Sequence, residues 1–515
     1  MPVLAMDSLK VSTKPEAARL LTEISRRLAS KNNRAYIVGG FVRDALSERD
    51  NEDIDIAVTG DALEIARDMA EVFYGKYIPL DDLDLVGRVV LPGNEWIIDF
   101  TSLKGNDILE DLSHRDFTID AIAVELTPEA AKSFTTDNLI DPHFGYDDLK
   151  NRVLRAVHQD IFTEDATRLL RAFRIAAELN FDIEPSTTSL ITRDARYITG
   201  VAGERIREEF VRVLSLPGAG RYLSLMDKLS LLTALIPELA PARGVDQPHA
   251  HYWDVLEHSL QTVNALDYVL READWDYGNP SALEMVPSSV RLQGHFNREI
   301  SAGSTAKTVL KLAALLHDIA KPQTKFMEDG HARFFGHPEK GAVTATAILE
   351  RLRFSRKEIQ LAELLIKYHL RPTQMSNFGM PTGRAVYRFF RDLGEAGIDV
   401  LYLSLADHLA ARGPALDPDE FREHARIAAY VIEKYYETSG PSAPPQIIDG
   451  NEIMEILQIP PGRVIGQLRE ALREAQAAGE IKDRNQAAEY LKDLYSRKYK
   501  NLPINLPGEK NEEKQ

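Results

Sequence analysis

Apolar residues recur with two different periods along the chain, and the change of period predicts where one part ends and the next begins. Residues 14–31 place apolar side chains at helical spacing and predict an amphipathic helix. Between residues 34 and 125, short β-rich runs alternate with helical stretches. The predicted strands are Ala35–Val38, Ile54–Val58, Arg88–Leu91, Trp96–Phe100 and Ile119–Val124. This alternation predicts a compact N-terminal α/β head built on a mixed sheet with helices.

From about residue 150 the helical period takes over, so the predicted fold class is a multidomain protein whose α/β head is followed by all-α parts. We expect the head over residues 1–150 and an all-α neck over residues 151–243. A second all-α domain over residues 244–440 carries a polar insert at 274–305, which we expect to be a surface excursion. The linker Pro441–Pro445 leads to a small helical module over 446–500, and residues 501–515 are expected to be disordered.

Two aspartates in one predicted strand are the first candidates for chemistry. Alternate strand residues share a face, so Asp53 and Asp55 point the same way while their isoleucine neighbours point into a core. The turn Gly39-Gly40 precedes a helix start, where backbone N–H groups suit phosphate. Two carboxylates beside such a turn suit a divalent metal and a triphosphate, whereas solvated surface aspartates are the alternative.

Further polar residues could complete a site with this pair. Asp99 lies on a predicted strand as a candidate third carboxylate, and Arg115 and Asp116 could hold a ribose and a triphosphate. Thr163 is a good N-cap for a helix that we expect to run to about Leu179. This helix groups charged side chains on the side opposite its apolar face, namely Glu164, Asp165, Arg168 and Arg171. They could read the edge of a nucleobase, although ordinary ion pairing on a solvated face is the alternative.

Histidines and aspartates fall at useful positions in the second helical domain. His317-Asp318 interrupts an apolar helix and is followed by Lys321-Pro322. The candidate ligands are His258, His317, Asp318 and Asp407, with His337 and His369 available for a second ion. Imidazole and carboxylate ligands suit Mn, Fe, Ni, Co or Zn, and a metal-bound hydroxide can hydrolyse phosphoesters. We expect His249, His251 and His408 to be structural or surface residues.

Composition adds limits to this picture. The 515 residues contain no cysteine, which excludes disulfides and thiolate zinc sites, and no apolar run long enough to span a bilayer. We therefore expect a cytoplasmic protein without a membrane partner. The net charge of −17 disfavours nucleic acid, but residues 151–215 balance ten arginines with ten acids, so an RNA-binding face could lie there.

Five motifs in order resemble the class II tRNA nucleotidyltransferase and bacterial poly(A) polymerase family over about residues 30–240. They are Gly39-Gly40-x-x-Arg43-Asp44, Asp53-x-Asp55, Arg115-Asp116, Glu164-Asp165-x-x-Arg168 and Gly203-Glu-Arg-Ile-Arg-Glu-Glu-Phe210. The resemblance implies a head with a nucleotidyltransferase-type sheet and two Mg²⁺ ions at Asp53 and Asp55, with Asp99 near them. It also implies that Gly39, Gly40 and Arg43 border the triphosphate. Asp165 and Arg168 would select CTP or ATP, with Glu164 holding the arginine.

The function implied is template-independent addition of CMP and AMP to the 3′ end of tRNA, by in-line attack that releases pyrophosphate. Three residues or segments depart from the family pattern. His114 stands where the family commonly has a second arginine, and Asp120 where it commonly has asparagine. Fourteen residues separate Asp99 from His114, which resembles enzymes that add only the two cytidines; many full CCA-adding relatives carry a longer flexible segment here.

The histidine pattern resembles the HD phosphohydrolase superfamily over about residues 248–410. Several bacterial tRNA nucleotidyltransferases carry such a domain, so the resemblance implies hydrolysis of phosphoesters at tRNA ends. Two alternatives stay open, a poly(A) polymerase and an HD phosphohydrolase whose N-terminal part only binds nucleotide or RNA. The pattern indicates no obligatory protein partner.

Overall fold

The computed structural model describes residues 9–81, 85–94, 96–248, 251–376, 379–439 and 447–498. The chain divides into two compact units, Met1–Leu216 with Tyr222–Pro237, and Pro217–Arg221 with Glu238–Gln515. The predicted linker Pro441–Pro445, the predicted disordered tail and His249 lie outside the described residues. The four-part division predicted from the sequence stays a prediction.

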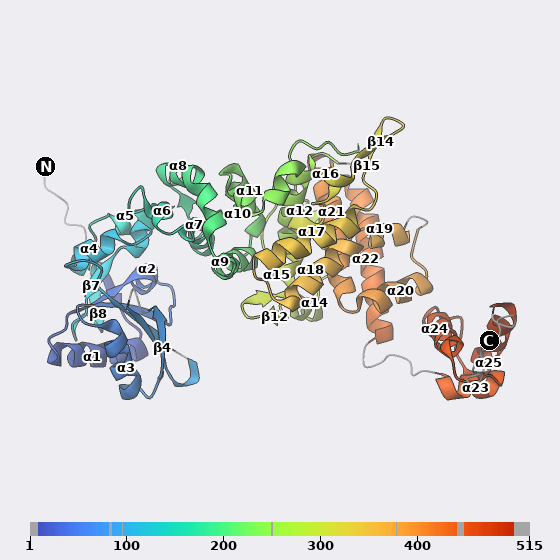
Figure 1. Ribbon diagram of the computed structural model, residues 1–515, viewed down its shortest axis with the longest axis horizontal. Coiled ribbons are helices and arrows are strands. Elements are labelled where there is room, and N and C mark those ends of the chain that lie inside the picture. Colours follow the sequence, from blue (N-terminus) through green and yellow to red (C-terminus); the bar gives the residue numbers. More distant parts are fainter. Residues whose placement is uncertain are drawn as a thin grey trace, which may run out of the picture. The chain divides into compact units, whose positions relative to one another are not determined.

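The head of the first unit is a mixed sheet with helices, as the alternating pattern predicted (Figure 1, blue). Its strands are β1 (Lys10–Ser12), β2 (Ala35–Val38), β3 (Asp53–Val58), β4 (Lys76–Asp81), β5 (Val86–Val90), β6 (Ile97–Ser102), β7 (Ala123–Glu125), β8 (Ser133–Thr135) and β9 (Leu139–Ile140). Its helices are α1 (Pro15–Ser30), α2 (Gly39–Leu46), α3 (Ala62–Val72), α4 (Ile108–Ser113) and α5 (Gly145–Asn151), with 3-10 turns η1 (Pro92–Asn94), η2 (Thr118–Asp120) and η3 (Thr136–Asn138). Seven strands pair in the order β4-β5-β6-β3-β2-β7-β9.

Both faces of this sheet bury apolar side chains, because the face that carries Asp55 also holds a cluster that includes Val38, Ala57 and Leu112. Ile54 and Ile56 are each 1% exposed, and α3 packs against β5 and β6. Strand β3 runs parallel to β6 and antiparallel to β2. The predicted helix over residues 14–31 is confirmed as α1, whose buried residues repeat at helical spacing.

One predicted strand in the head is wrong in detail, and one strand was not predicted. The predicted strand Ile119–Val124 begins instead as η2, and β7 starts only at Ala123. The buried ion pair between Asp120 and Arg43 (2.7 Å) fixes this turn, and short-range hydrophobicity does not reveal it. Strand β4 was missed because it is a largely exposed edge strand that contains Pro79.

The rest of the first unit is helical, apart from the short parallel strands β10 (Val153–Leu154) and β11 (Asp182–Ile183). Its remaining elements are α6 (Ile161–Glu164), α7 (Arg168–Leu179), α8 (Pro185–Asp194), η4 (Ala195–Gly200), α9 (Gly203–Ser215), α10 (Ala219–Lys228), α11 (Leu231–Leu235) and η5 (Pro237–Ala242), of which α10 and η5 extend into the second unit. The single helix predicted from Thr163 to Leu179 is wrong, because the chain breaks between α6 and α7. Asp165 has extended backbone, and its carboxylate accepts a hydrogen bond from the Thr167 N–H (3.0 Å), which competes with the helical ladder.

The second unit is built mainly of helices. They are α12 (Val255–Val269), α13 (Pro280–Met285), α14 (Val290–Phe296), α15 (Ala306–Leu316), α16 (Lys321–Thr324), α17 (His337–Arg351), α18 (Arg356–Tyr368), α19 (Arg371–Ser376), α20 (Gly383–Leu393), α21 (Ala396–Arg412), η6 (Gly413–Ala415), α22 (Pro418–Ser439), α23 (Gly450–Leu457), α24 (Arg463–Ala477) and α25 (Arg484–Lys498). Two small hairpins, β12 (Glu299–Ser301) with β13 (Ser304–Thr305) and β14 (Phe326–Glu328) with β15 (His331–Arg333), connect them. Helices α23 to α25 share a small core of their own around Ile453, Leu468 and Leu491.

The segment at residues 274–305, predicted to be a surface excursion, is mostly exposed or half-buried, and a few large apolar side chains anchor it. Trp275, Leu292 and Phe296 are each under 10% exposed, and α13 packs against α22. The ring of Phe296 meets that of Tyr402 on α21 at 4.5 Å between centroids. Burial of these few apolar side chains holds an otherwise polar segment on the surface of the domain. In the described part of the chain, no helix combines the length and apolarity needed to cross a membrane.

Candidate active sites

Strand β3 places the candidate transferase carboxylates on the face of the head sheet opposite Ile54 and Ile56. Asp55 lies opposite Asp99 of β6 in the parallel register and opposite Val38, the last residue of β2. Gly39 follows with φ +65°, and a Cβ there would lie 2.9 Å from Asp55 Oδ2. Only glycine accepts both that backbone conformation and that approach. The start of α2 therefore lies in contact with the Asp55 carboxylate.

The three carboxylates differ in their partners. Burial raises the pKa of Asp55 to about 6, Arg115 opposes the shift and Asp99 adds to it. Burial also raises the pKa of Asp53, against the effect of Arg88. The negative charge of Asp99 is balanced by Arg88, which donates a hydrogen bond to each of its two oxygens at 2.8 Å.

These partners test whether a divalent cation fits. Among the described residues, none donates a hydrogen bond to a side-chain oxygen of Asp53 or Asp55. Two neighbouring carboxylates with raised pKa values and unoccupied oxygens form a donor set that suits a hard divalent cation. Asp99 fits this purpose less well, because its oxygens hold Arg88.

A pocket of about 390 Å³ within the first unit is rich in charged side chains. Its charged and hydroxyl lining residues are Thr101, Lys104, Asp111, His114, Arg115, Asp116, Asp165, Thr167, Arg168, Arg171, Arg205, Glu208 and Glu209. Planar guanidinium groups beside carboxylates can bind both phosphate oxygens and base edges. The pocket therefore has the chemistry that a nucleoside triphosphate needs.

Three of the predicted nucleotide-binding residues are paired inside or beside this pocket, namely Glu164, Asp165 and Arg168. Arg168 Nη1 lies 3.3 Å from Glu164 Oε2, and its Nη2 donates to the His114 carbonyl (3.0 Å). The Asp165 carboxylate accepts from Arg205 Nη2 of α9 at 2.7 Å. Both base-edge candidates are thus held in place, Arg168 by α6 and Asp165 by α9.

Other predicted residues sit deeper. The Arg43 side chain is 12% exposed and bridges Asp44 (2.9 Å) and Asp120 (2.7 Å). Arg43 therefore connects α2 to the turn η2 and stabilises the start of α2. The departure from asparagine to Asp120 supplies the negative charge that this buried arginine needs.

The remaining three lie at the pocket wall. Arg171 Nε of α7 lies 2.8 Å from Asp116 Oδ2, so it forms an ion pair with one of the two residues predicted to hold the sugar and phosphates. Arg115 pairs with Asp111 at 3.1 Å.

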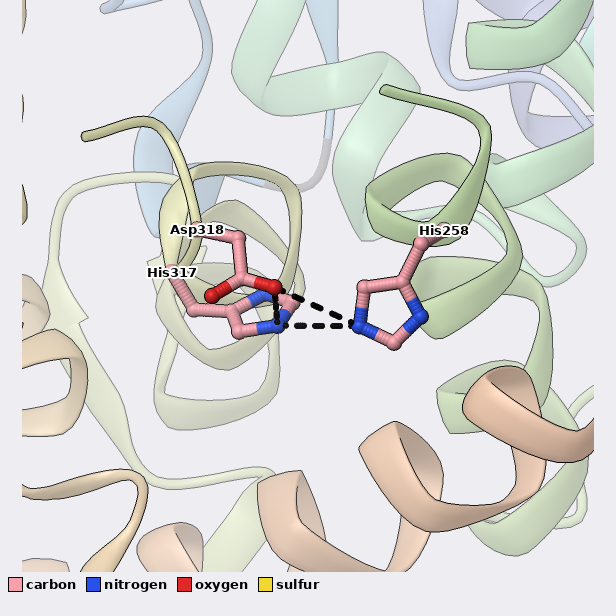
Figure 2. Close-up of side chains that lie close together, drawn as sticks. All are labelled: His258, His317 and Asp318. Atoms are coloured by element: carbon pink, nitrogen blue, oxygen red, sulfur yellow. Dashed lines mark hydrogen bonds and ion pairs between the residues drawn. The ribbon is translucent and has the colours of Figure 1, made fainter. Parts of the chain in front are cut away.

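The histidine set of the second unit converges on one carboxylate. Asp318 follows α15, and Figure 2 shows its carboxylate beside the rings of His317 and His258, the latter from α12. His317 Nε2 lies 3.2 Å from Asp318 Oδ2, while His337 Nε2 lies 3.3 Å from Oδ1. His369 Nε2 lies 3.4 Å from His337 Nε2. Asp318 thus belongs to two groups that could each hold a cation, one with His258 and His317 and one with His337 and His369.

Backbone carbonyls orient three of these rings. The Nδ1 atoms of His317, His337 and His369 donate to the carbonyls of Ala314, Phe334 and Ile366 at 2.6–2.8 Å. Because a carbonyl only accepts, each Nδ1 carries the proton and each Nε2 of a neutral ring keeps its lone pair. The Nε2 lone pairs of His337 and His369 then face each other, which is unfavourable without a cation between them. This geometry fits a metal.

The charge states agree with that interpretation. Burial lowers the pKa of His369 to about 3, and nearby His317 adds to the effect, so this ring is neutral. Although burial opposes it, the pKa of Asp318 lies well below the ordinary value because His317 and Lys321 are close. Asp407 of α21 lies 3.0 Å from His258 Nε2 and completes the first group.

Family models match the parts of the chain that carry the two candidate sites. Residues 35–103 and 93–155 match the family described as Poly A polymerase head domain, and residues 180–243 match the family described as probable RNA and SrmB-binding site of polymerase A. Residues 255–412 match the HD domain family. A CC-adding tRNA nucleotidyltransferase of Geobacter sulfurreducens is 33% identical over 457 residues, which cover 89% of this chain and 91% of that protein. The chain belongs to the tRNA nucleotidyltransferase family.

Other relatives span the same length. An A-adding tRNA nucleotidyltransferase of Deinococcus radiodurans is 33% identical over 456 residues, 87% of this chain and 92% of that protein. The structure of the Thermotoga maritima CCA-adding enzyme complexed with tRNA matches with a TM-score of 0.64 and 22% identity, covering 94% of this chain and 96% of that one. This structural likeness confirms the predicted fold class.

Sequence reasoning missed several residues of this tRNA nucleotidyltransferase. Arg88, Asp111 and Arg205 each pair with a predicted site residue, and Lys321 Nζ lies 2.6 Å from Asp318 Oδ2. Arg205 lies in the Gly203–Phe210 motif and Lys321 follows the His317-Asp318 pair in the quoted pattern, whereas Arg88 and Asp111 belong to no motif. His251, expected to be structural or surface, lines the metal pocket with its ring centroid 5.2 Å from that of His258.

Proposed function

We propose that this nucleotidyltransferase transfers CMP from CTP to the 3′ end of tRNA and stops after the two cytidines. Family membership supports nucleotide addition to tRNA. A CC-adding and an A-adding relative are equally identical to this chain, at 33%, so the choice of cytidine rests on the structure. AMP from ATP, as added by full CCA-adding and A-adding relatives, is the competing product within the same family.

The observation that carries this choice is the short link between β6 and α4. Lys104 N–H donates to Asp111 (3.0 Å), Asn106 N–H donates to Glu110 (2.8 Å), and Asp107 caps the Glu110 N–H (3.0 Å). Gly105 has φ +88° and lies against the Glu110 side chain. The link is therefore fixed by its own hydrogen bonds, and it contains no segment long enough to reset the base-reading residues from CTP to ATP.

The roles of the residues follow from their places. Asp53 and Asp55 would hold Mg²⁺, which when bound polarises the phosphate and favours the leaving of pyrophosphate. Asp165 and Arg168 present an acceptor and donors to the cytosine edge, and Glu164 and Arg205 keep them in position. Arg115, Arg171 and Lys104 offer positive charge to the triphosphate.

The test uses tRNA that ends at the discriminator base, at C or at CC, supplied with CTP, ATP or both. Addition of two cytidines and no adenosine supports the proposal. Addition of A to the CC end, or a long A tail, would replace it with CCA addition or poly(A) polymerisation.

We also propose that the HD domain hydrolyses phosphoesters at RNA ends with a bound transition metal. The shared carboxylate of Asp318 and the facing Nε2 atoms of His337 and His369 favour this second function. Of the ions that suit such ligands, Mn, Fe, Ni, Co and Zn remain candidates. Metal analysis of the purified protein, with phosphate release after each ion is restored to chelated protein, tests it. Failure of every ion to restore hydrolysis would leave the domain without this activity.

A further inference from the structure

The HD pocket opens beside a hairpin that carries unusually exposed apolar side chains. The hairpin β14–β15 turns at Asp329-Gly330, both with positive φ, as two-residue hairpins require. Phe326 is 40% exposed, Met327 63% and Phe335 70%. Single exposed apolar residues are common, but three within ten residues at the mouth of a charged pocket need an explanation.

Phe335 is placed between the surface and the metal ligands. It lines the pocket of about 550 Å³ that also contains Asp318, His337 and His369. Gly336, with φ +77°, then turns the chain so that α17 begins at the ligand His337. The ring of Phe335 packs against that of Phe326, with centroids 5.4 Å apart and an interplanar angle of 37°. Phe326 therefore supports one side of Phe335, while most of the Phe335 side chain stays exposed.

The same pocket is lined by charges of both signs. Lys321, Arg333 and Arg412 line it together with the carboxylates of Asp318 and Asp407. Lys321 is largely buried and held by Asp318 and by the Gln247 side chain (2.6 Å). A phosphorylated group can thus be bound at the inner end, with an aromatic surface at the outer end.

We propose that Phe335, supported by Phe326, is a stacking platform for the base of the terminal nucleotide whose phosphoester enters the HD site. This inference rests on the proposed hydrolase function and adds its substrate class, a phosphorylated nucleoside end as opposed to a base-free phosphoester. Aromatic faces bind bases of any sequence, since each base has a π face, so the platform selects for a nucleotide without selecting which one.

The hairpin offers a matched control. Met327 neighbours Phe326 on β14, pairs with Ala332 and does not line the pocket. Met327→Ala therefore removes a comparable exposed apolar side chain from the same hairpin. Phe335→Tyr keeps an aromatic face and should restore what Phe335→Ala loses.

The first readout is binding, which does not depend on hydrolysis. The fluorescence of 2-aminopurine riboside 3′-phosphate is followed as full-length chelated protein is added, because stacking quenches this probe. Phe335→Ala should weaken binding on the order of tenfold or more, in the range that removal of one stacking aromatic gives. Met327→Ala and Phe335→Tyr should bind like the wild type. Equal affinity of Phe335→Ala and wild type would overturn the platform.

The second readout separates the platform from the hydrolase function. With metal restored, phosphate release from adenosine 3′-phosphate and from glycerol 2-phosphate is compared. Phe335→Ala should lower kcat/KM for the nucleotide and leave that for the base-free ester unchanged. Loss on both substrates would overturn the stacking role, whereas no hydrolysis of either by the wild type would refute the hydrolase proposal and leave the binding result to decide the platform. Nucleotide addition to tRNA should be the same in all variants, and calorimetric unfolding of each variant reports whether its HD domain is folded.

Discussion

At the scale of single residues, the candidate transferase site is defined by which charges are left without partners. Arg43, Asp99 and Asp116 are each neutralised by another side chain, whereas Asp55 carries an unpaired, partly buried carboxylate. Such a group destabilises the metal-free fold and gains most from a cation.

Asp55→Asn should abolish nucleotide addition and stabilise the metal-free protein at neutral pH. The pKa of Asp55 is raised from 3.8 to about 6 in the folded state, so the folded protein binds this proton more tightly than the unfolded chain. The wild type therefore loses stability relative to the variant as pH rises from about 4 to about 6, by about 2 to 3 kcal/mol. Calorimetry with chelator at pH 4.5 and 7.5 measures the difference between the two proteins. A stability difference that does not change with pH would show that the pKa of Asp55 is not raised in the folded protein.

Arg205→Gln should weaken CTP binding severalfold to tenfold. It removes the 2.7 Å contact that holds Asp165 and helps keep the pKa of that carboxyl below its usual range, against the effect of burial. Calorimetric titration with CTP in the absence of tRNA measures the change. Arg196→Gln, a change at an exposed arginine in the same unit that does not line the pocket, is the control. Equal CTP affinity of Arg205→Gln and Arg196→Gln would show that Arg205 does not help to position the residues that bind the base.

Sequence pattern predicted some of these residue-scale features and missed others. Strand periodicity placed Asp53 and Asp55 on the face opposite Ile54 and Ile56, since that needs only local geometry. It could not predict that Arg205 reaches Asp165 across 40 positions, because such pairing depends on how two helices pack.

At the scale of elements, the departures from regular structure lie at the candidate site. The helix predicted through residues 163–179 is interrupted at Asp165, and the β6–α4 link is fixed by Asp111 and Glu110. Propensity alone favours a continuous helix, and it is overridden because Asp165 bonds to Thr167 and Arg205.

Glu110→Ala should increase adenosine addition to a CC-ended tRNA severalfold. The substitution frees the Asn106 backbone and side chain, both of which Glu110 holds, and so loosens the link beside the pocket. Primer extension with ATP alone measures the adenosine addition. Glu64→Ala, on the exposed side of α3, is the control. No gain of adenosine over this control would show that the fixed link does not set the choice of nucleotide.

At the scale of the whole molecule, the order of parts could be predicted because each part has its own period and its own motif. The anchoring of the insert at residues 274–305 could not be predicted, because its few apolar residues contact helices α21 and α22, which are distant in sequence. The two candidate sites lie in separate compact units, so we expect their activities to be separable.

Asp53→Ala with Asp55→Ala should abolish nucleotide addition and leave hydrolysis by the metal-restored HD domain unchanged. His317→Ala with Asp318→Ala should do the reverse, since Asp318 serves both histidine groups. Primer extension and phosphate release are measured on both double variants in parallel. Loss of both activities in either double variant would contradict independent sites.

The path of the chain between the units bears on how the protein is synthesised. Residues Pro217–Arg221 belong to the second unit, where Gly220 N–H donates to Asp267 (3.1 Å), yet Tyr222–Pro237 returns to the first. On the ribosome, the first unit can complete its fold once Pro237 has emerged, while the preceding segment waits for Asp267. One helix, α10, thus contains residues that reach their final surroundings at different times. A single cleavage after Pro237 would release the whole first unit, but it would also remove Pro217–Arg221 from the second unit.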